Sequence, residues 1–419
     1  MSPASKPDRL AIWLDMRHVA DLQIDRRQNL SLTYTDEAVE IFGLGTLCLS
    51  VALPVARTTY RHNLTFPWAE GMLPEGETRT VLERLFRVRR GDTFRLLVAI
   101  GRDCAGAVSF LDPGENPVSS PERHDPLTSE QLEEAISDLK SHPLGADDDV
   151  RVSLGGIQAK LLLTKDGDGR WTRPAPGVPS THILKPEPFE FPGLVASEAY
   201  ILRAANYCGF PSANIELSNI GGRDVLIVER FDRKIDAHGR ILRIHQEDAG
   251  QALSLDPSNG KLKYQSSLDE PPSLSAIAEV LRTHGTDPVR DLLRLLEMTT
   301  IHIAVGNTDA HARNHGFIHV AGGVSLSPLY DAAPTREFVT TRTVALWVGD
   351  QMVLSEITRD HLVREAVGWG FPQATAERTV RRILDTLPDA LQRAAEETPQ
   401  VRPEIVEATL ARTRRLQTR

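Results

Sequence analysis

The chain of 419 residues is too long for one small hydrophobic core, so we expect two or three domains. Its hydrophobic content of 41% and charged content of 25% are those of an ordinary globular protein, and its net charge of −9 argues against a wholly basic nucleic-acid binder. Three scattered cysteines form no Cys-x-x-Cys pair, which disfavours a zinc site or a disulfide framework and fits a reducing cytoplasm. Residues 1–9 are polar and no long apolar run occurs, so neither a secretion signal nor a membrane span is expected.

The first part of the chain, up to about residue 108, is expected to be mostly β structure with one short helix. Runs rich in strand-forming residues predict three strands, at 10–14, 30–34 and 47–53. A turn at 73–79 leads into the helix, which begins near Thr78 and has apolar residues on one face. The Pro- and Gly-rich stretch 112–126 is interpreted as a linker, and Thr128 with Gln131 forms a capping-box pattern that predicts a helix after it.

A glycine turn between two strand-like pieces follows at residues 152–163. Glycines there allow backbone N–H groups to approach phosphates, as in nucleotide-binding loops, although a plain hairpin is the commoner meaning of such a turn. The next strand, 181–185, ends in Lys185, which can reach the α and β phosphates of ATP. Glu198, in the first turns of a helix expected at 195–207, either orients Lys185 as an ion pair or simply favours the helix N-terminus.

The segment 224–233 is an apolar strand that emerges into charged residues, which is where a kinase hinge would receive adenine. From about residue 245 the chain is expected to be mostly helical. Apolar stripes predict helices at 273–283 and 288–303. Later helices are expected at 359–369, 373–387 and 403–415.

The most informative stretch is 306–315, with Asp331 close behind. Asp309 and Asn314 are five positions apart, and a short insert at 319–327, expected to be a β-hairpin, separates them from Asp331. Phosphoryl transfer needs one carboxylate to receive the proton of the attacking hydroxyl, and an amide oxygen and a second carboxylate to hold magnesium. The spacing is that of a kinase catalytic loop and metal-binding aspartate without their usual spelling, while the alternative is a polar loop with a helix cap.

The order of these features is that of a bilobal kinase. The glycine turn comes first, and the strand that ends in Lys185, the helix with Glu198 and the hinge strand follow it. The helical part with the Asp309 motif comes last. We therefore predict an α+β, protein-kinase-like fold with an N-terminal β-rich subdomain at 1–145, a kinase N-lobe at 146–235 and a mostly helical C-terminal lobe at 236–419.

The sequence resembles the HipA family of bacterial serine/threonine kinases, the toxin half of a type II toxin–antitoxin pair. The segments that carry the resemblance span most of the chain, at 71–76, 101–107, 153–160, 181–185, 228–233, 245–248, 307–314 and 329–331. The resemblance implies that Asp309 is catalytic, that Asn314 and Asp331 bind magnesium, and that Lys185 binds the ATP phosphates. Ala310 and Arg313 stand where the best-known pattern of the family has Gly and Lys.

Other roles come from the resemblance alone. It implies a phosphate-binding loop, adenine-binding hinge positions and a histidine near the nucleotide, at Leu154, Gly155, Gly156, Ile157, Gln158, Glu229, Phe231 and His311. It also implies autophosphorylation on Ser153, which expels that loop and inactivates the kinase. The cofactors implied are ATP and Mg²⁺.

The resemblance further implies a target and partners. The expected substrate is an aminoacyl-tRNA synthetase, whose phosphorylation arrests translation and growth and produces persistence. The expected partners are a HipB-like helix-turn-helix antitoxin and, through the complex with it, the operator DNA of the operon that the complex represses. Two other functions stay open at this point, namely a small-molecule phosphotransferase and a catalytically idle co-repressor subunit.

Overall fold

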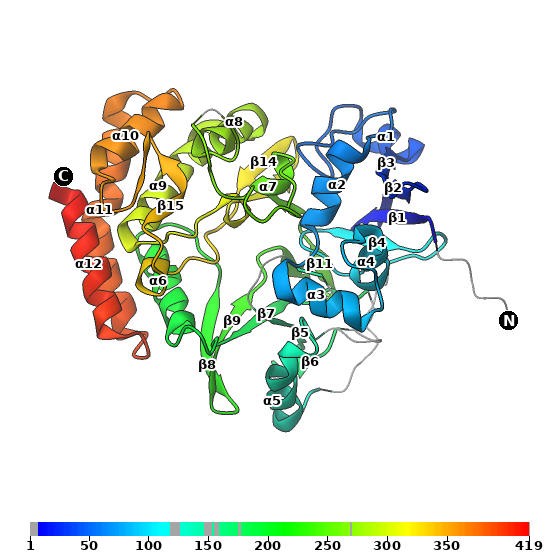
Figure 1. Cartoon of the computed structure of the whole chain (residues 1–419), viewed down its shortest axis with the longest axis horizontal. Coiled ribbons are helices and arrows are strands. Elements are labelled where there is room, and N and C mark those ends of the chain that lie inside the picture. The colour runs from blue at the N-terminus through cyan, green and yellow to red at the C-terminus, as the bar shows by residue number, and fades with distance from the viewer. Residues whose placement is uncertain are drawn as a thin grey trace. The chain divides into compact units, whose positions relative to one another are not determined.

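The computed structural model describes residues 7–117, 126–145, 153–154, 159–174, 177–268 and 270–418 (Figure 1). The chain divides into two compact units. The first comprises Met1–Leu184, Asp232–Glu247 and Asp256–Gly260, and the second comprises Lys185–Phe231, Asp248–Leu255 and Lys261–Arg419. The expected division at about 145 and 235 stays a prediction.

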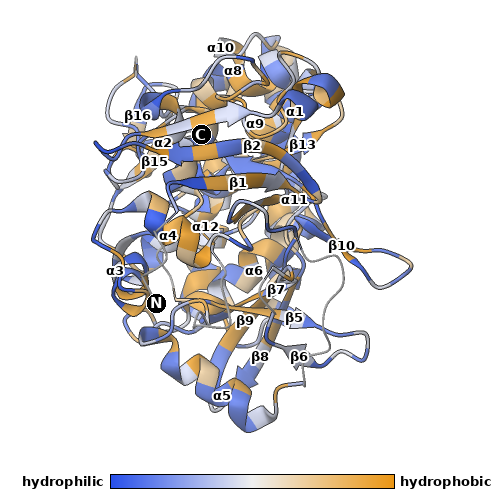
Figure 2. Cartoon of the chain, turned by 90° about the vertical axis from the view of Figure 1, so that its right-hand side faces the viewer, coloured by the Kyte–Doolittle hydropathy of each residue, from blue (hydrophilic) through white to orange (hydrophobic). Residues whose placement is uncertain are grey.

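The first unit is built around an antiparallel sheet of four strands in the order β3-β2-β1-β4. The strands are β1 (Arg9–Leu14), β2 (Arg17–Ile24), β3 (Leu30–Tyr34) and β4 (Val108–Leu111). The helices α1 (Asp36–Phe42), α2 (His62–Gly71), α3 (Gly76–Leu85) and α4 (Thr93–Ile100) accompany it, and most of α4 is orange in Figure 2 because this helix is largely apolar. Trp68, Phe94 and Phe110 are fully buried in its core, with the rings of Trp68 and Phe110 5.8 Å apart.

The predicted strands at 10–14 and 30–34 are confirmed, and the structure contains three helices here besides the one expected. The strand predicted at 47–53 is wrong, because this segment is irregular although Leu49 and Leu53 are fully buried. Its polar groups bond to side chains instead of a neighbouring strand. The carboxylate of Glu247 accepts hydrogen bonds from Ser50 Oγ (2.6 Å) and Val51 N (2.7 Å). The apolar residues of this segment are therefore buried as their pattern suggests, but its backbone does not pair with a neighbouring strand.

The remainder of the first unit contains a helix with the predicted capping box and several short strands. Thr128 and Gln131 cap α5 (Ser129–Ser137), which confirms that pattern, and a 3₁₀ turn (Asp138–Lys140) follows the helix. The strands β5 (Leu161–Lys165) and β6 (Trp171–Thr172) are antiparallel, and β5 also pairs with β7 (His182–Pro186), which leads into the second unit. The short strands are β10 (Arg233–Ile235), β11 (Ile241–Arg243) and β12 (Gln246–Asp248), and the last residue of β12 already belongs to the second unit.

The second unit is mostly helical, as predicted. Its helices are α6 (Leu194–Tyr207), α7 (Ala249–Ala252), α8 (Leu274–His284), α9 (Pro288–Val305), α10 (Arg359–Gly368), α11 (Gln373–Glu396) and α12 (Pro403–Thr418). Helix α11 packs against α6, α9 and α12. It runs past the end predicted at residue 387 and includes Pro388 in its interior. The buried Ala390 and Leu391 continue its apolar face beyond that proline. Packing here outweighs the proline's disruption of the helix.

Three pairs of strands complete the second unit. They are β8 (Ile215–Ile220) with β9 (Arg223–Glu229), β13 (Gly316–Val320) with β14 (Gly323–Leu326), and β15 (Thr343–Val348) with β16 (Gln351–Val353). The β13–β14 pair confirms the hairpin expected between Asn314 and Asp331. In the part of the chain that the structure describes, no helix combines the length and apolar character needed to cross a membrane.

Candidate active site

Helix α9 leads directly into the loop that carries Asp309. The helix ends at Gly306, whose φ of 80° is a left-handed conformation that favours glycine. A Cβ at this position would lie 2.3 Å from Nη1 of Arg412, so the glycine also makes room for that side chain. Arg412 donates from Nη1 to the carbonyl of Val305 (2.9 Å) and from Nη2 to Glu337 (2.6 Å). The last turn of α9 is thereby fastened to α12 and to the 3₁₀ turn Thr335–Glu337.

The Asp309 loop is held by hydrogen bonds on several sides. The amide N–H of Asp309 donates to Asn307 Oδ1 (3.0 Å), and Asn314 Nδ2 donates to the carbonyl of Asp309 (2.9 Å). The hydroxyl of Tyr264 donates to Oδ1 of Asp309 (2.8 Å), and the aspartate is exposed. An exposed carboxylate held in one orientation is suited to receive a proton from a hydroxyl of a bound substrate.

The hairpin brings the two proposed metal ligands into one region. Asn314 ends the 3₁₀ turn Ala312–Asn314 just before β13, and Asp331 follows β14. The residues next to them are bonded to each other, since the hydroxyl of Tyr330 donates to the carbonyl of Arg313 (2.9 Å). Asp331 has φ of 52°, a left-handed conformation that aspartate adopts more readily than most residues.

Lys185 lies between two carboxylates. Its Nζ donates to Glu198 Oε1 (2.8 Å) and to Oδ1 of Asp331. Burial by itself would lower the pKa of Lys185, but the charges of Asp331 and Glu198 outweigh it and raise the pKa above its ordinary value. The lysine is therefore a fixed positive charge beside a proposed metal ligand, and its pairing with Glu198 confirms the ion pair considered from the sequence.

Two buried histidines contact the loop that carries Asp309. Burial lowers the pKa of His302 to about 3 and that of His315 to about 4, so both rings are neutral near pH 7. Asn307 Nδ2 donates to Nδ1 of His302 (3.0 Å). The pKa of His311 is well below its usual range because of burial and the nearby charges of Lys263 and Arg313, and its ring meets that of Tyr264 edge to face at 5.4 Å.

The two residues expected at an adenine hinge lie at the end of β9. The amide nitrogen of Asn214 donates to Oε2 of the exposed Glu229 (3.1 Å). The ring of Phe231 lies 5.8 Å from that of Tyr330, the residue before Asp331. Phe231 therefore belongs to the same cluster of the second unit as the proposed metal ligand.

Ser153 and Leu154 belong to the first unit. Ser153 is fully buried, with its Oγ donating to the carbonyl of Met72 (2.6 Å) and its N–H to the carbonyl of Asp103 (2.7 Å). Leu154 packs against the core of this unit. The other expected residues of the phosphate loop, Gly155, Gly156, Ile157 and Gln158, lie outside the described residues.

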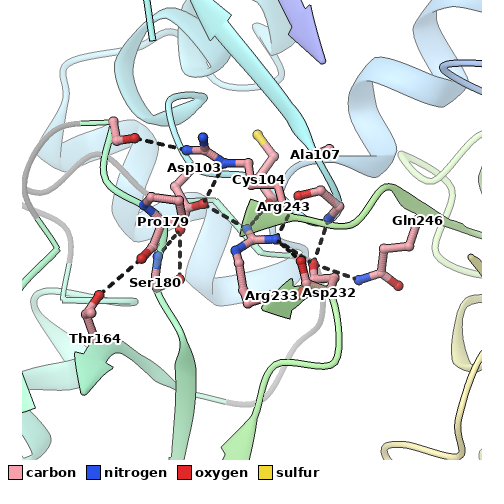
Figure 3. A network of polar contacts seen from close by, with 12 residues as sticks. Asp103, Cys104, Ala107, Thr164, Pro179, Ser180, Asp232, Arg233, Arg243 and Gln246 are labelled. Carbon is pink, nitrogen blue, oxygen red and sulfur yellow. Dashed lines mark hydrogen bonds and ion pairs between the residues drawn. The ribbon is translucent and has the colours of Figure 1, made fainter. Parts of the chain in front are cut away.

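A buried polar network fixes the residue that bonds to Ser153. Figure 3 shows Asp103 at its centre, where the carboxylate accepts from Arg233 Nη2 (2.9 Å), Ser180 N (2.9 Å) and Ser180 Oγ (2.7 Å). Arg233 also donates to the carbonyl of Gly106 (2.8 Å). A buried carboxylate with these partners is held firmly, so the carbonyl of Asp103 offers Ser153 a fixed acceptor.

The residues present fit a magnesium ion. Asn314 and Asp331 supply an amide and a carboxylate oxygen, the hard donors that Mg²⁺ prefers, and the Nδ2 bond of Asn314 to Asp309 fixes which end of the amide is the acceptor. Among the described residues there is no group of three or more His, Cys, Asp or Glu that could hold a metal by itself. Two oxygen donors from the chain, Asn314 and Asp331, match a magnesium site that is completed by phosphates and water.

The structure also identifies residues that sequence reasoning missed. Tyr264 is 45 positions from Asp309, and Arg412 is 107 positions from Val305. Thr335 Oγ1 accepts from the N–H of Thr308 at 2.7 Å, which connects the Asp309 loop to the following 3₁₀ turn. No short motif includes these residues, because their partners lie far away in sequence.

The architecture is an α+β, protein-kinase-like fold. Lys185, Asp309, Asn314 and Asp331 supply the kinds of group that phosphoryl transfer needs. Two family models match the chain, the HipA N-terminal domain at residues 10–111 and the HipA-like C-terminal domain at 152–391. The chain therefore belongs to the HipA family.

Similar proteins agree with this assignment. A protein of Sinorhizobium fredii named putative kinase Y4mE is 32% identical, over 93% of this chain and 92% of its own length. The serine/threonine-protein kinase toxin HipA of Shewanella oneidensis is 28% identical, over 82% of this chain and 80% of its own. A solved structure of Shewanella oneidensis HipA with HipB and its operator DNA has a TM-score of 0.82 and 26% identity, and covers 98% of this chain and 99% of that one.

Proposed function

We propose that this chain is an ATP- and Mg²⁺-dependent serine/threonine protein kinase and the toxin of a type II toxin–antitoxin system. The observation that carries the proposal is the joint placement of Asp309, Asn314, Asp331 and Lys185 in one compact unit, each with contacts that suit its role. Membership of the HipA family supports the same reading.

In the proposed reaction, Asp309 receives the proton of the acceptor hydroxyl as its oxygen attacks the γ-phosphorus of ATP. The bond from that phosphorus to the bridging oxygen of ADP breaks, and ADP leaves. Lys185, kept charged by its carboxylate partners, neutralises phosphate charge, while Glu198 orients it. Magnesium held by Asn314 and Asp331 would supply further neutralisation of the phosphates. The loop 154–158, Glu229, Phe231 and His311 are proposed to bind the nucleotide.

Self-inactivation through Ser153 is part of the proposal. The Oγ of this serine occupies a fully buried position against a carbonyl, and the carboxylate of Asp103 belongs to the same polar network. A phosphoserine carries roughly two negative charges near neutral pH and would be repelled from such acceptors. A phosphorylated Ser153 would not fit its buried position, and we propose that the adjoining phosphate loop is expelled with it.

The proposed partners follow from the similar proteins. The solved relative is a complex of HipA, HipB and operator DNA, so we infer a HipB-like helix-turn-helix antitoxin and co-repression of the operon in complex with it. The net charge of −9 suits DNA contacts made mainly by the antitoxin. We also propose an aminoacyl-tRNA synthetase as the substrate and the cytoplasm as the location.

The test is the intact mass of the purified protein before and after incubation with magnesium and ATP. The wild type is expected to gain one phosphate, on Ser153, and neither Asp309→Ala nor Ser153→Ala should gain it. The Ser153→Ala variant should also stay active toward an added substrate. A wild type that starts unmodified and gains no phosphate would contradict the proposal and favour a small-molecule phosphotransferase or an idle co-repressor subunit.

A further inference from the structure

A pocket of about 680 Å³ adjoins the catalytic aspartate within the second unit. The residues that line it include Asp309 and Thr308 and the apolar Phe338, Val344, Trp347 and Met352. All the described residues that line it belong to the second unit. Whatever occupies this space lies beside the group that is proposed to take the proton of the acceptor hydroxyl.

The walls of the pocket are fixed relative to Asp309. Gln265 donates from its N–H to the carbonyl of Ala345 (2.9 Å), and its Oε1 accepts from the N–H of Trp347 (2.7 Å), so strand β15 is fastened to the segment that carries Tyr264. Tyr264 in turn bonds to Asp309. The wall formed by β15 is thus connected to the catalytic carboxylate through two consecutive residues.

A second wall is fastened in the same way. Thr335 Oγ1 accepts from the N–H of Thr308 (2.7 Å) and lies 3.3 Å from Oδ1 of Asn307. Phe338 follows in the same segment. The apolar surfaces therefore keep a set distance and direction from the base, which is what selection of residues flanking an acceptor hydroxyl requires.

The chemistry of the lining is mostly apolar and neutral. Among the described lining residues, Asp309 is the single carboxylate and there is no lysine, arginine or histidine. Charged residues of a substrate would lose water here without finding an opposite charge, apart from the catalytic carboxylate itself. Aromatic and aliphatic surface instead favours apolar side chains, which gain by leaving water.

Resting on the proposed kinase function, we infer that this pocket is the acceptor groove. It takes an extended segment of the substrate protein in which uncharged, apolar residues flank the phosphorylated serine or threonine. Met352 and Trp347 act as specificity-determining residues at its wall. The inference concerns the class of acceptor segment and is separate from whether the chain transfers phosphate at all.

The experiment uses the full-length protein, radiolabelled ATP with magnesium, and a degenerate peptide library with a central serine and one fixed residue at each flanking position. For the wild type, fixed Leu, Ile, Met or Phe in at least one position should raise incorporation about tenfold over Asp, Glu, Lys or Arg, as is usual for an apolar subsite. Met352 is 41% exposed on β16, so both Met352→Glu and Met352→Lys are compatible with folding.

These two variants are matched in position and change only the sign of the added charge. Met352→Glu should shift preference toward Lys and Arg, and Met352→Lys toward Asp and Glu, at the same peptide position. Val367→Glu is the control, because Val367 is 43% exposed on α10 and does not line the pocket. This control should keep the wild-type preference.

The remaining outcomes separate this inference from the proposed function. Phosphorylation of peptides without a preference for apolar flanking residues would overturn the groove assignment. The same change in charge preference for Met352→Glu and Met352→Lys would also overturn it. Neither result would contradict the kinase function. Phosphate on Ser153 with no peptide modified would also overturn the groove assignment. Faster ATP consumption with small alcohols in place of peptides would assign the pocket to a small-molecule acceptor. No transfer to peptides or to Ser153 would remove the proposed function itself.

Discussion

The hydroxyl of Tyr264 donates a hydrogen bond of 2.8 Å to the carboxylate of Asp309, across 45 positions of sequence. The same tyrosine meets the buried ring of His311 edge to face, which restricts its own position. Tyr264 therefore orients the proposed catalytic base and leaves the base exposed to the substrate.

We expect Tyr264→Phe to slow magnesium- and ATP-dependent phosphorylation about tenfold, because a hydrogen bond to a charged group contributes about 1.5–3 kcal/mol. ATP affinity should stay close to that of the wild type. The measurement is the rate of phosphate gain by intact mass. Tyr207→Phe is a matched control, since this hydroxyl bonds to Glu397 away from the site. Equal rates for wild type and Tyr264→Phe would contradict the role.

The metal role of Asp331 is tested best by asparagine, which tolerates the left-handed backbone at this position. Asp331→Asn should retain the fold and lose most of the increase in ATP affinity that magnesium produces, as calorimetric titration with and without the metal would show. Magnesium dependence like that of the wild type would exclude Asp331 as a ligand.

The same variant makes a prediction about pH. The folded-state pKa of Lys185 is raised above its ordinary value, so its stabilising contribution is complete below the unfolded pKa of roughly 10.4 and is lost only at higher pH. The contribution of Lys185 to the stability difference between wild type and Asp331→Asn should therefore be constant from about pH 6 to pH 8. Urea unfolding at several pH values measures that difference.

Arg412 is expected to be a positioning residue for the catalytic loop, since it joins the end of α9 to Glu337. Arg412→Ala should lower kcat about tenfold with little change in KM for ATP, as expected when a loop loses its alignment and the nucleotide contacts persist. Arg414→Ala, an exposed change on the same helix, is the control. A loss of activity explained entirely by unfolding, or an equal loss in the control, would refute this role.

Buried His302 predicts loss of stability in acid. Its pKa of about 3 lies below the unfolded value of about 6.5, so the unfolded chain takes up a proton that the folded one refuses. Stability should fall as pH drops from about 6.5 toward 3, with a contribution of up to about 1.4 kcal/mol per pH unit from this residue. His302→Gln should reduce the slope, measured by urea unfolding, and the exposed His238→Gln should not. Identical slopes would contradict the assignment.

Local sequence patterns determined many elements of this protein. The capping box of α5, the apolar stripes of α8 and α9, and the β13–β14 hairpin follow from residues close together in the chain. The spacing of Asp309 and Asn314 is also local. Such features depend on backbone propensity and on periodicity, which act over a few residues.

Only the tertiary structure decided which distant side chains meet. Lys185 pairs with Asp331 across 146 positions, Tyr264 finds Asp309, and Glu247 satisfies the segment whose apolar pattern suggested a strand. The pocket beside Asp309 is likewise assembled from segments between residues 191 and 352. These contacts result from the packing of whole elements, so no local pattern encodes them. The sequence therefore identified the chemical groups of the site, while the fold determined their partners and the surface that faces the acceptor.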